Sequence, residues 1–365
     1  MKPATTVLRL TTAASVFVSA FTANCFQFTP GNLVVYRVGT GTGGLSSVAT
    51  ATFLDEYNLL GVRVQSIAMP TTGASALTAV GNDSTEGIVS MSQDGTRLVF
   101  TGYRADVGIA NPSQSDPATV NRVIGTVALA GVVDTSVALT DPTGTIRSGT
   151  STDASSLFYV GTSSGLRYVA APSGAATTTL IDSRNTRETL LNGNTLFGSS
   201  VLAGNTSKVL SYGNLPIGAT VGTPVITQGF TDTINGYALF DLSSAVAGPD
   251  TLYALSTGQN KLSKFTFNGT SWSASGTITA TGIQNITGVS TNGTDVSLFL
   301  TSGSGIFSEY DASGYNANIT GSLALLTSAG ANTAFRGVAL IPEPSTLSLG
   351  LLAAGTLLGL RRRRS

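Results

Sequence analysis

Six short segments rich in small residues recur along the chain, and this repeat constrains the fold more than any other feature. Their starts lie 42 to 60 residues apart, and the last three intervals are close to 49. Each of the first five is followed by a turn and a more apolar run of strand-forming residues. A period of about 40–50 residues is typical of a four-stranded propeller blade. The segments are Thr85–Met91, Thr145–Thr152, Arg187–Gly193, Gly236–Leu242, Ile286–Thr291 and Phe335–Leu340.

The two ends of the chain complement each other. Near the N-terminus, Leu33–Val38, Ala51–Tyr57 and Val62–Ala68 read as three strands that lack a first one, whereas the sixth segment has no strands after it. Joining them completes one blade and removes exposed sheet edges. We therefore predict an all-β fold, a six-bladed β-propeller over residues 24–341. Seven blades are the alternative, if the long second unit hides another blade, and a β-helix fits these intervals badly.

The composition agrees with strands and excludes one class of partner. Only 10% of the residues are charged and Gly contributes 43, which favours an all-β protein over a helical one. Residues 21–341 carry 13 basic and 18 acidic residues, a net charge of −5. Because nucleic-acid binding needs a basic surface, we expect no nucleic-acid partner.

The N-terminus has the layout of a secretory signal peptide. Lys2 and Arg9 precede the apolar stretch Leu10–Phe21, and small residues follow at the expected cleavage positions. We therefore predict a signal peptide over residues 1–23 and an exported body. Cys25 has no partner for an internal disulfide, and we expect it to have no functional role near the mature N-terminus.

The last 24 residues form a second targeting segment, residues 342–365. Pro342, Glu343 and Pro344 are followed by an apolar run from Thr346 to Leu360. As a helix this run is short for a hydrocarbon core of about 30 Å, although flanking residues can reach the interfaces. The chain then ends in a basic cluster, which should stay cytoplasmic and halt translocation of one transmembrane helix. The cluster comprises Arg361, Arg362, Arg363 and Arg364.

This tail resembles the PEP-CTERM sorting signal of Gram-negative bacteria, because all three of its parts occur in order at the C-terminus. The resemblance implies cleavage near Pro342–Pro344 by an exosortase, a processing enzyme of the inner membrane. It also implies delivery to the cell surface or extracellular matrix, often beside extracellular polysaccharide. The opening of the body, residues 28–37 and 53–57, resembles a group of PEP-CTERM surface proteins as well, which brings no activity with it.

Two motifs suggest enzymes, but neither has its required context. Gly39–Gly44 matches a dinucleotide-binding loop without the helix that must follow it. Gly161–Gly165 matches the serine-hydrolase elbow, whose serine normally needs a histidine base, and the chain contains no His. We therefore predict no catalytic residues and no cofactor, and interpret both motifs as hairpin turns.

A polar residue recurs at or just before the start of each of the six segments. If these are the innermost strands, the side chains ring one mouth of the central channel, with Glu86 and Arg336 close enough to pair. Either they satisfy one another and the buried backbone ends, or they form a ligand site. Carboxylates with channel waters could hold Ca²⁺, although no calcium-binding loop pattern is present. The residues are Glu86, Arg147, Glu188, Asn235, Thr287 and Arg336.

These observations favour a non-enzymatic surface or matrix protein whose propeller is a binding or structural module for polysaccharide or protein. The alternative is an extracellular propeller enzyme, a lactonase or hydrolase that uses channel carboxylates and a metal ion. Trp272, Phe265 and Phe267 either fill the space between blades or form a carbohydrate-stacking patch.

Overall fold

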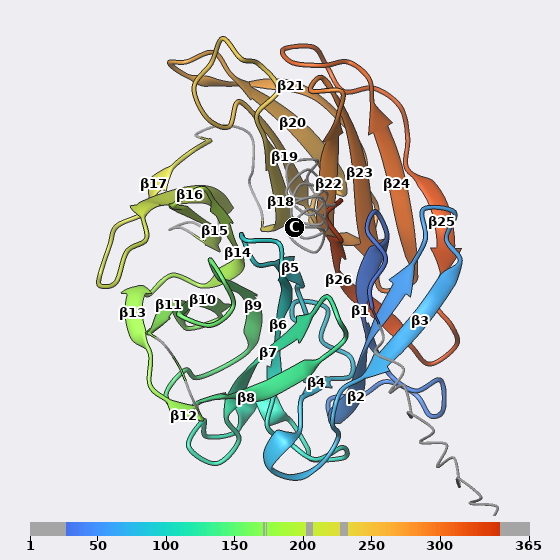
Figure 1. Cartoon of the computed structure of the whole chain (residues 1–365), viewed down its shortest axis with the longest axis vertical. Coiled ribbons are helices and arrows are strands. Elements are labelled where there is room, and N and C mark those ends of the chain that lie inside the picture. The colour runs from blue at the N-terminus through green and yellow to red at the C-terminus, as the bar shows by residue number, and fades with distance from the viewer. Residues whose placement is uncertain (1–26, 171, 173, 202–206, 227–232, 344–365) are drawn as a thin grey trace, which may run out of the picture.

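The computed structural model describes residues 27–343 apart from 171, 173, 202–206 and 227–232. These residues form strands and two short 3₁₀ turns, Gly73–Ser75 and Pro112–Gln114. The sheets are arranged around a central axis, as in a β-propeller (Figure 1). The predicted all-β, propeller-like architecture is thus confirmed.

Four sheets are antiparallel meanders of four strands. The first contains β9 (Ile146–Thr150), β10 (Leu157–Thr162), β11 (Gly165–Ala170) and β13 (Thr179–Asp182). The second contains β14 (Thr186–Asn192), β15 (Thr195–Val201), β16 (Ser207–Asn214) and β17 (Thr223–Pro224). The third contains β18 (Ile234–Phe240), β19 (Thr251–Ser256), β20 (Lys261–Phe267) and β21 (Trp272–Thr279). The fourth contains β22 (Ile283–Thr291), β23 (Asp295–Ser302), β24 (Gly305–Asp311) and β25 (Ala324–Ser328).

The remaining sheet has ten strands and joins the two ends of the described chain. Its N-terminal part contains β1 (Leu33–Val38), β2 (Ala49–Tyr57), β3 (Arg63–Ala68) and β4 (Thr78–Val80). Its other strands are β5 (Ser90–Met91), β6 (Arg97–Tyr103), β7 (Arg122–Ala128), β8 (Val133–Leu139), β12 (Ala175–Ala176) and β26 (Ala334–Leu340). The last strand, β26, pairs antiparallel with β1, with Leu33 opposite Leu340 and Val38 opposite Ala334. The predicted pairing of the two chain ends is therefore observed.

The first strands of the repeating units lie around the axis in a closed cycle. Each of β5, β9, β14, β18, β22 and β26 contacts the next, and β26 contacts β5 (Figure 1). Backbone hydrogen bonds link the segment just before β5 to its neighbours in the cycle, from Ile88 N to Arg147 O of β9 at 3.0 Å and from Gly337 N of β26 to Gly87 O at 3.0 Å. Such close approach explains the small residues, because a Cβ at Gly337 would overlap the backbone of Gly87, Ile88 and Val89.

The sheets do not separate into six four-stranded units as the sequence predicted. The first residues of β2 extend beyond its pairing with β1, and Ala49–Ala51 pair with β4 instead. Thr78 of β4 in turn pairs with Tyr103 of β6. This bridge of three residues fuses two groups of strands into one sheet. Of the predicted strand 85–91, only Ser90–Met91 form a strand, β5.

The hydrophobic core is divided into clusters that lie between neighbouring sheets. Leu255 of the third sheet and Leu298 of the fourth belong to one fully buried cluster, together with Ile286. Strand-forming side chains that alternate with polar ones supply these contacts. The interior of the ring is lined by the inner strands, with polar side chains near their starts and mostly apolar ones farther along.

The targeting segments fall outside this description. The predicted signal peptide, the apolar run, Pro344 and Arg361–Arg364 lie outside the described residues, whereas Pro342 and Glu343 end them as exposed residues. Within the described part of the chain, no helix is long and apolar enough to cross a membrane.

Candidate functional site

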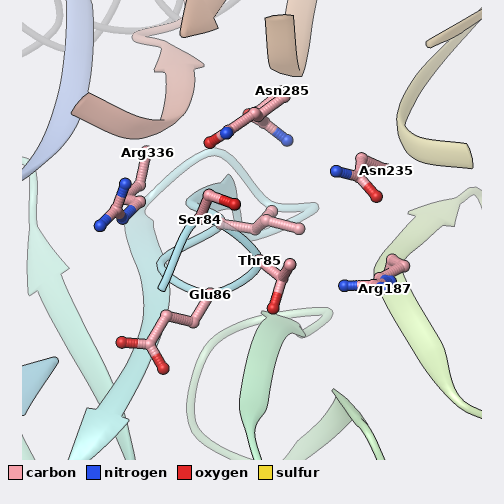
Figure 2. A pocket seen from close by; sticks show the side chains of 9 residues that line it. Ser84, Thr85, Glu86, Arg187, Asn235, Asn285 and Arg336 are labelled. Carbon is pink, nitrogen blue, oxygen red and sulfur yellow. The ribbon is translucent and has the colours of Figure 1, made fainter. Parts of the chain in front are cut away.

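One cavity lies at the end of the channel where the inner strands begin, and we call it the channel mouth. It is small, with a volume of about 10 Å³, which is room for about one water molecule. Figure 2 shows polar side chains from several inner strands and from the loop before β5 arranged around it. Its lining consists of Ser84, Thr85, Glu86, Ile88, Arg187, Asn235, Gln284, Asn285 and Arg336.

The structure brings three of the six predicted residues to this cavity and places the others elsewhere. Glu86, Asn235 and Arg336 line the channel mouth, whereas Arg147 does not. Glu188 and Thr287 line a second cavity farther along the channel, of about 180 Å³, among mostly apolar side chains. The prediction that all six form one ring was therefore wrong.

The error has a simple geometric cause. Successive side chains of a strand point to opposite faces, so a shift of one residue changes what a side chain lines. Arg187 lines the channel mouth and its neighbour Glu188 does not. On β22 the error is one of position along the strand, because Gln284 and Asn285 lie nearer its start than Thr287. Counting from the strand start would have found Arg187, which is the second residue of β14 as Asn235 is of β18.

Glu86 is buried and accepts hydrogen bonds from a backbone N–H and a tyrosine hydroxyl instead of forming an ion pair. Its Oε1 accepts from Val80 N at 2.5 Å and its Oε2 accepts from the Tyr103 hydroxyl at 2.8 Å. Burial, and secondarily the charge of Asp83, raises the pKa of Glu86 to about 8, although the Tyr103 hydrogen bond lowers it. Glu86 and Arg336 form no direct ion pair, although they lie close enough for each charge to shift the other's pKa. The bridge strand β4 supplies the backbone N–H that captures this carboxyl.

Glu188 has a comparable structural role between two inner strands. Its Oε2 accepts from the backbone N–H of Tyr237 at 2.8 Å, which ties β14 to β18. Burial raises the pKa of Glu188 to about 8, and the Tyr237 hydrogen bond acts in the opposite direction. Asn285 repeats the pattern, because its Oδ1 accepts from Val338 N at 3.0 Å and so ties β22 to β26. For these side chains the structural interpretation of the ring is supported.

The arginines at the channel mouth are different, because parts of their guanidinium groups lack partners. Arg336 is 5% exposed and donates from Nη2 to the Gly81 carbonyl at 2.9 Å, whereas its Nε is buried without a partner. The Nε and Nη1 atoms of Arg187 are also buried without partners. Burial lowers the pKa of both arginines. The negative charge of Asp83 opposes that shift in Arg187, and the charges of Glu86 and then Asp83 oppose it in Arg336. Both remain cationic at neutral pH, since an arginine pKa starts near 12.5.

Two amide side chains of the lining also have unused hydrogen-bonding capacity. Asn235 Oδ1 and Gln284 Oε1 are buried and accept no hydrogen bond. Buried polar groups are nearly always satisfied, and each exception in a folded protein calls for an explanation. At the channel mouth, unpartnered donors of Arg187 and Arg336 therefore lie beside unpartnered acceptors of Asn235 and Gln284.

No group of three or more His, Cys, Asp or Glu side chains that could hold a metal ion occurs among the described residues. The Ca²⁺ interpretation stays a prediction.

The aromatic residues near β21 lie mainly against the core. Phe265 is buried in the cluster between the second and third sheets, and Trp272 packs against that cluster while half-buried. Phe267 and Trp272 stack with ring centroids 5.3 Å apart. Together they border an open groove that also includes Ser211 and Thr223. These contacts support the predicted role of filling the space between blades.

No family model and no curated protein matches the chain. Solved structures do resemble it in fold. A chain of a nidogen/laminin complex matches with a TM-score of 0.50 and 10% identity, over 85% of this chain and 100% of that one. TolB from Acinetobacter baumannii matches with a TM-score of 0.50 and 11% identity, over 86% and 67%. The periplasmic gluconolactonase PpgL of Pseudomonas aeruginosa has a TM-score of 0.45 and 11% identity, over 82% and 83%. At such identities the likeness concerns the fold alone.

Proposed function

We propose that the body of this protein is a binding module and that the channel mouth is its binding site. One observation carries the proposal: unpartnered, buried guanidinium and amide groups gather on the same cavity. A buried group that lacks its hydrogen bond costs about 1–3 kcal/mol, and more when it is charged. A ligand that satisfies these groups recovers that free energy on binding, so the arrangement suits recognition.

The role we propose is non-enzymatic. Glu86 and Glu188, the two channel carboxyl groups that the enzyme alternative would use, accept hydrogen bonds from backbone N–H groups. They are thereby committed to holding strands together. The lactonase- or hydrolase-like alternative would require these groups to reach a substrate as well.

We also propose that the ten-stranded sheet acts as two blades joined at β4, which gives six blades in total. The four antiparallel strands β26, β1, β2 and β3 would form one blade, and β5, β6, β7 and β8 the next. The closed cycle of six inner strands supports this count. A seventh blade has no inner strand in that cycle.

For the terminal segments we propose export by the signal peptide and sorting through the PEP-CTERM-like tail. The Pro342–Glu343 step is exposed and follows the ring-closing strand β26 by one residue, Ile341. Cleavage near Pro342–Pro344 would therefore leave every strand in place. After processing by an exosortase at the inner membrane, the body would reside at the cell surface or in the matrix, in contact with extracellular polysaccharide.

Two experiments test these proposals. The full chain, expressed in an exosortase-bearing Gram-negative host, should yield a surface or matrix form whose mass ends near residues 342–344. A form that stays in the cytoplasm would refute export. For binding, the purified full chain should co-sediment with acidic polysaccharide, and turnover of lactone substrates without such binding would favour the enzyme alternative.

A further inference from the structure

The chain leaves the ring toward its C-terminal segment at the same end of the sheet as the turn between β2 and β3. Tyr57, which ends β2, and Leu340, which ends β26, both lie opposite Leu33 of β1. The residues that follow these two strands, Asn58–Val62 and Ile341–Glu343, therefore leave the sheet at one end. They also border the same groove, which is lined from both segments.

The turn between β2 and β3 presents apolar side chains to solvent on a backbone that is held in place. Leu60 is 83% exposed, and Leu59 and Val62 are exposed beside it. The Oδ1 of Asn58 accepts from Leu60 N and Val62 N, both at 3.0 Å, and its backbone N donates to Val62 O at 3.0 Å. Gly61 adopts a positive φ of 78° and lies too close to β25 to admit a Cβ. Because turns are usually polar, an ordered apolar turn indicates an apolar partner.

The groove beside this turn extends the apolar surface. It has a volume of about 670 Å³ and shares Met91, Gly288 and Leu340 with the apolar cavity inside the channel. Among the described residues that line it, Glu343 is the one ionisable side chain. We call the turn and the groove together the exit face, and its apolar side chains are Leu59, Leu60, Val62, Val289, Phe299 and Pro342.

The length of the connection to the C-terminal apolar run determines what this face meets. Resting on the sorting proposed above, the run that begins at Thr346 spans the inner membrane. Only Pro344 and Ser345 separate it from Glu343. Fully extended, that connection spans about 11 Å at most. Because the headgroup layer of each leaflet is itself about 5–8 Å thick, the body of the unprocessed protein is held against the headgroups with its exit face toward them.

We propose that the exit face docks on the lipid bilayer and that the turn residues Leu59, Leu60 and Val62 insert among the headgroups. Burial of apolar side chains drives this docking. Attraction to anionic lipids does not, because residues 21–341 carry a net charge of −5. Docking fixes the position of Pro342 and Glu343 at the membrane surface, where the processing enzyme acts.

The test places a fluorophore on the turn of the full chain, reconstituted in phosphatidylcholine vesicles that contain a lipid with a nitroxide-labelled headgroup. Leu60→Cys carries the fluorophore in a chain that also contains Cys25→Ser. Val107→Cys is the matched control, because Val107 is exposed and follows β6 at the end remote from Met91. We expect the nitroxide to quench the fluorophore at residue 60 at least fivefold more strongly than at residue 107. Equal quenching at the two positions would overturn the proposal.

Two further variants separate insertion of the turn from nearness imposed by the connection. Leu59→Ser with Val62→Ser removes apolar side chains and leaves the backbone hydrogen bonds of the turn in place. Quenching at residue 60 should then fall at least threefold. Unchanged quenching would show that the connection alone keeps the face near lipid, which overturns the docking.

Two other outcomes would also overturn the docking, for different reasons. Quenching at residue 60 that appears only after an exosortase is added to the vesicles would assign the exit face to a protein partner. A full chain that does not float with the vesicles would refute the membrane-spanning tail on which the docking rests. Flotation without quenching would instead leave the proposed sorting intact and refute the docking alone.

Discussion

Replacing Glu188 by Gln should stabilise the protein at neutral and higher pH, which is unusual for a change in the interior. Glu188 is 6% exposed, and burial raises its pKa from the ordinary 4.5 to about 8. The folded state therefore holds the proton more tightly than the unfolded state. The stabilisation from this proton is fully present below pH 4.5 and is lost as the pH rises through the folded-state pKa of about 8.

The size of the effect follows from the shift. One pKa unit corresponds to about 1.4 kcal/mol, so ionisation of Glu188 lowers the free energy of unfolding by about 3 kcal/mol between pH 5 and pH 8. Gln has the same shape, still accepts from Tyr237 N, and does not ionise. Glu188→Gln should match the parent within about 1 kcal/mol at pH 5 and exceed it by several kcal/mol at pH 8. The parent's remaining pH dependence should come partly from Glu86, whose pKa is also raised to about 8.

Urea unfolding, followed by the fluorescence of the single Trp272, measures this difference at the two pH values. Glu56→Gln is the matched control, because both oxygens of the buried Glu56 accept hydrogen bonds: Oε1 from Thr29 N at 2.9 Å and Asn32 Nδ2 at 2.6 Å, and Oε2 from Gln65 Nε2 at 2.5 Å. There an amide NH₂ would face existing donors, so we expect a loss of about 1–3 kcal/mol. A Glu188→Gln variant that loses as much stability as the parent between pH 5 and pH 8 would refute the reasoning.

Three further substitutions probe other parts of the fold. Arg187→Gln should keep or raise the free energy of unfolding measured in urea, because it removes a partly unpartnered buried cation. A fall in that free energy of more than about 1 kcal/mol, on the order of one hydrogen bond, would argue for a structural role instead. Lys264→Met should lower the free energy of unfolding by about 3–5 kcal/mol in the same assay, because Lys264 is fully buried and its Nζ lies 2.9 Å from Asp311 Oδ2. An unchanged unfolding midpoint would show that this ion pair contributes nothing to stability. Gly337→Ala should lower the melting temperature measured by circular dichroism, by an amount that reflects about 1–3 kcal/mol of overpacking. Gly303→Ala, where a Cβ meets nothing within 4 Å, should leave the melting temperature unchanged. Equal effects of the two substitutions would contradict the close approach of backbones at the ring.

The repeat of strands was predictable from the sequence, because turn residues and apolar runs recur at a nearly constant interval. Segments such as Arg187–Gly193 and Phe335–Leu340 were recognised to within two residues of β14 and β26. The bridge through β4 was not predictable, since three residues of Thr-Ala-Val carry no signal that distinguishes a bridge from a loop.

The site was predicted less well than the fold, because it depends on strand register. Choosing Glu188 instead of Arg187 moved the expected contact to the opposite face of the same strand. The partners of Glu86 were equally hidden, since Val80 N and the Tyr103 hydroxyl come from elements that a repeat pattern does not place beside it.

The pairing of β26 with β1 determines how the body would bear a mechanical load. A pull applied at Glu343 acts along β26, and the antiparallel hydrogen bonds to β1 lie perpendicular to that direction. When the resisting force acts beyond Val38, at the opposite end of the pair, the residue pairs from Leu33–Leu340 to Val38–Ala334 are loaded together in shear rather than opened one after another. A tether attached at this end would transmit its force to the ring through the β26–β1 hydrogen bonds, which must then break together.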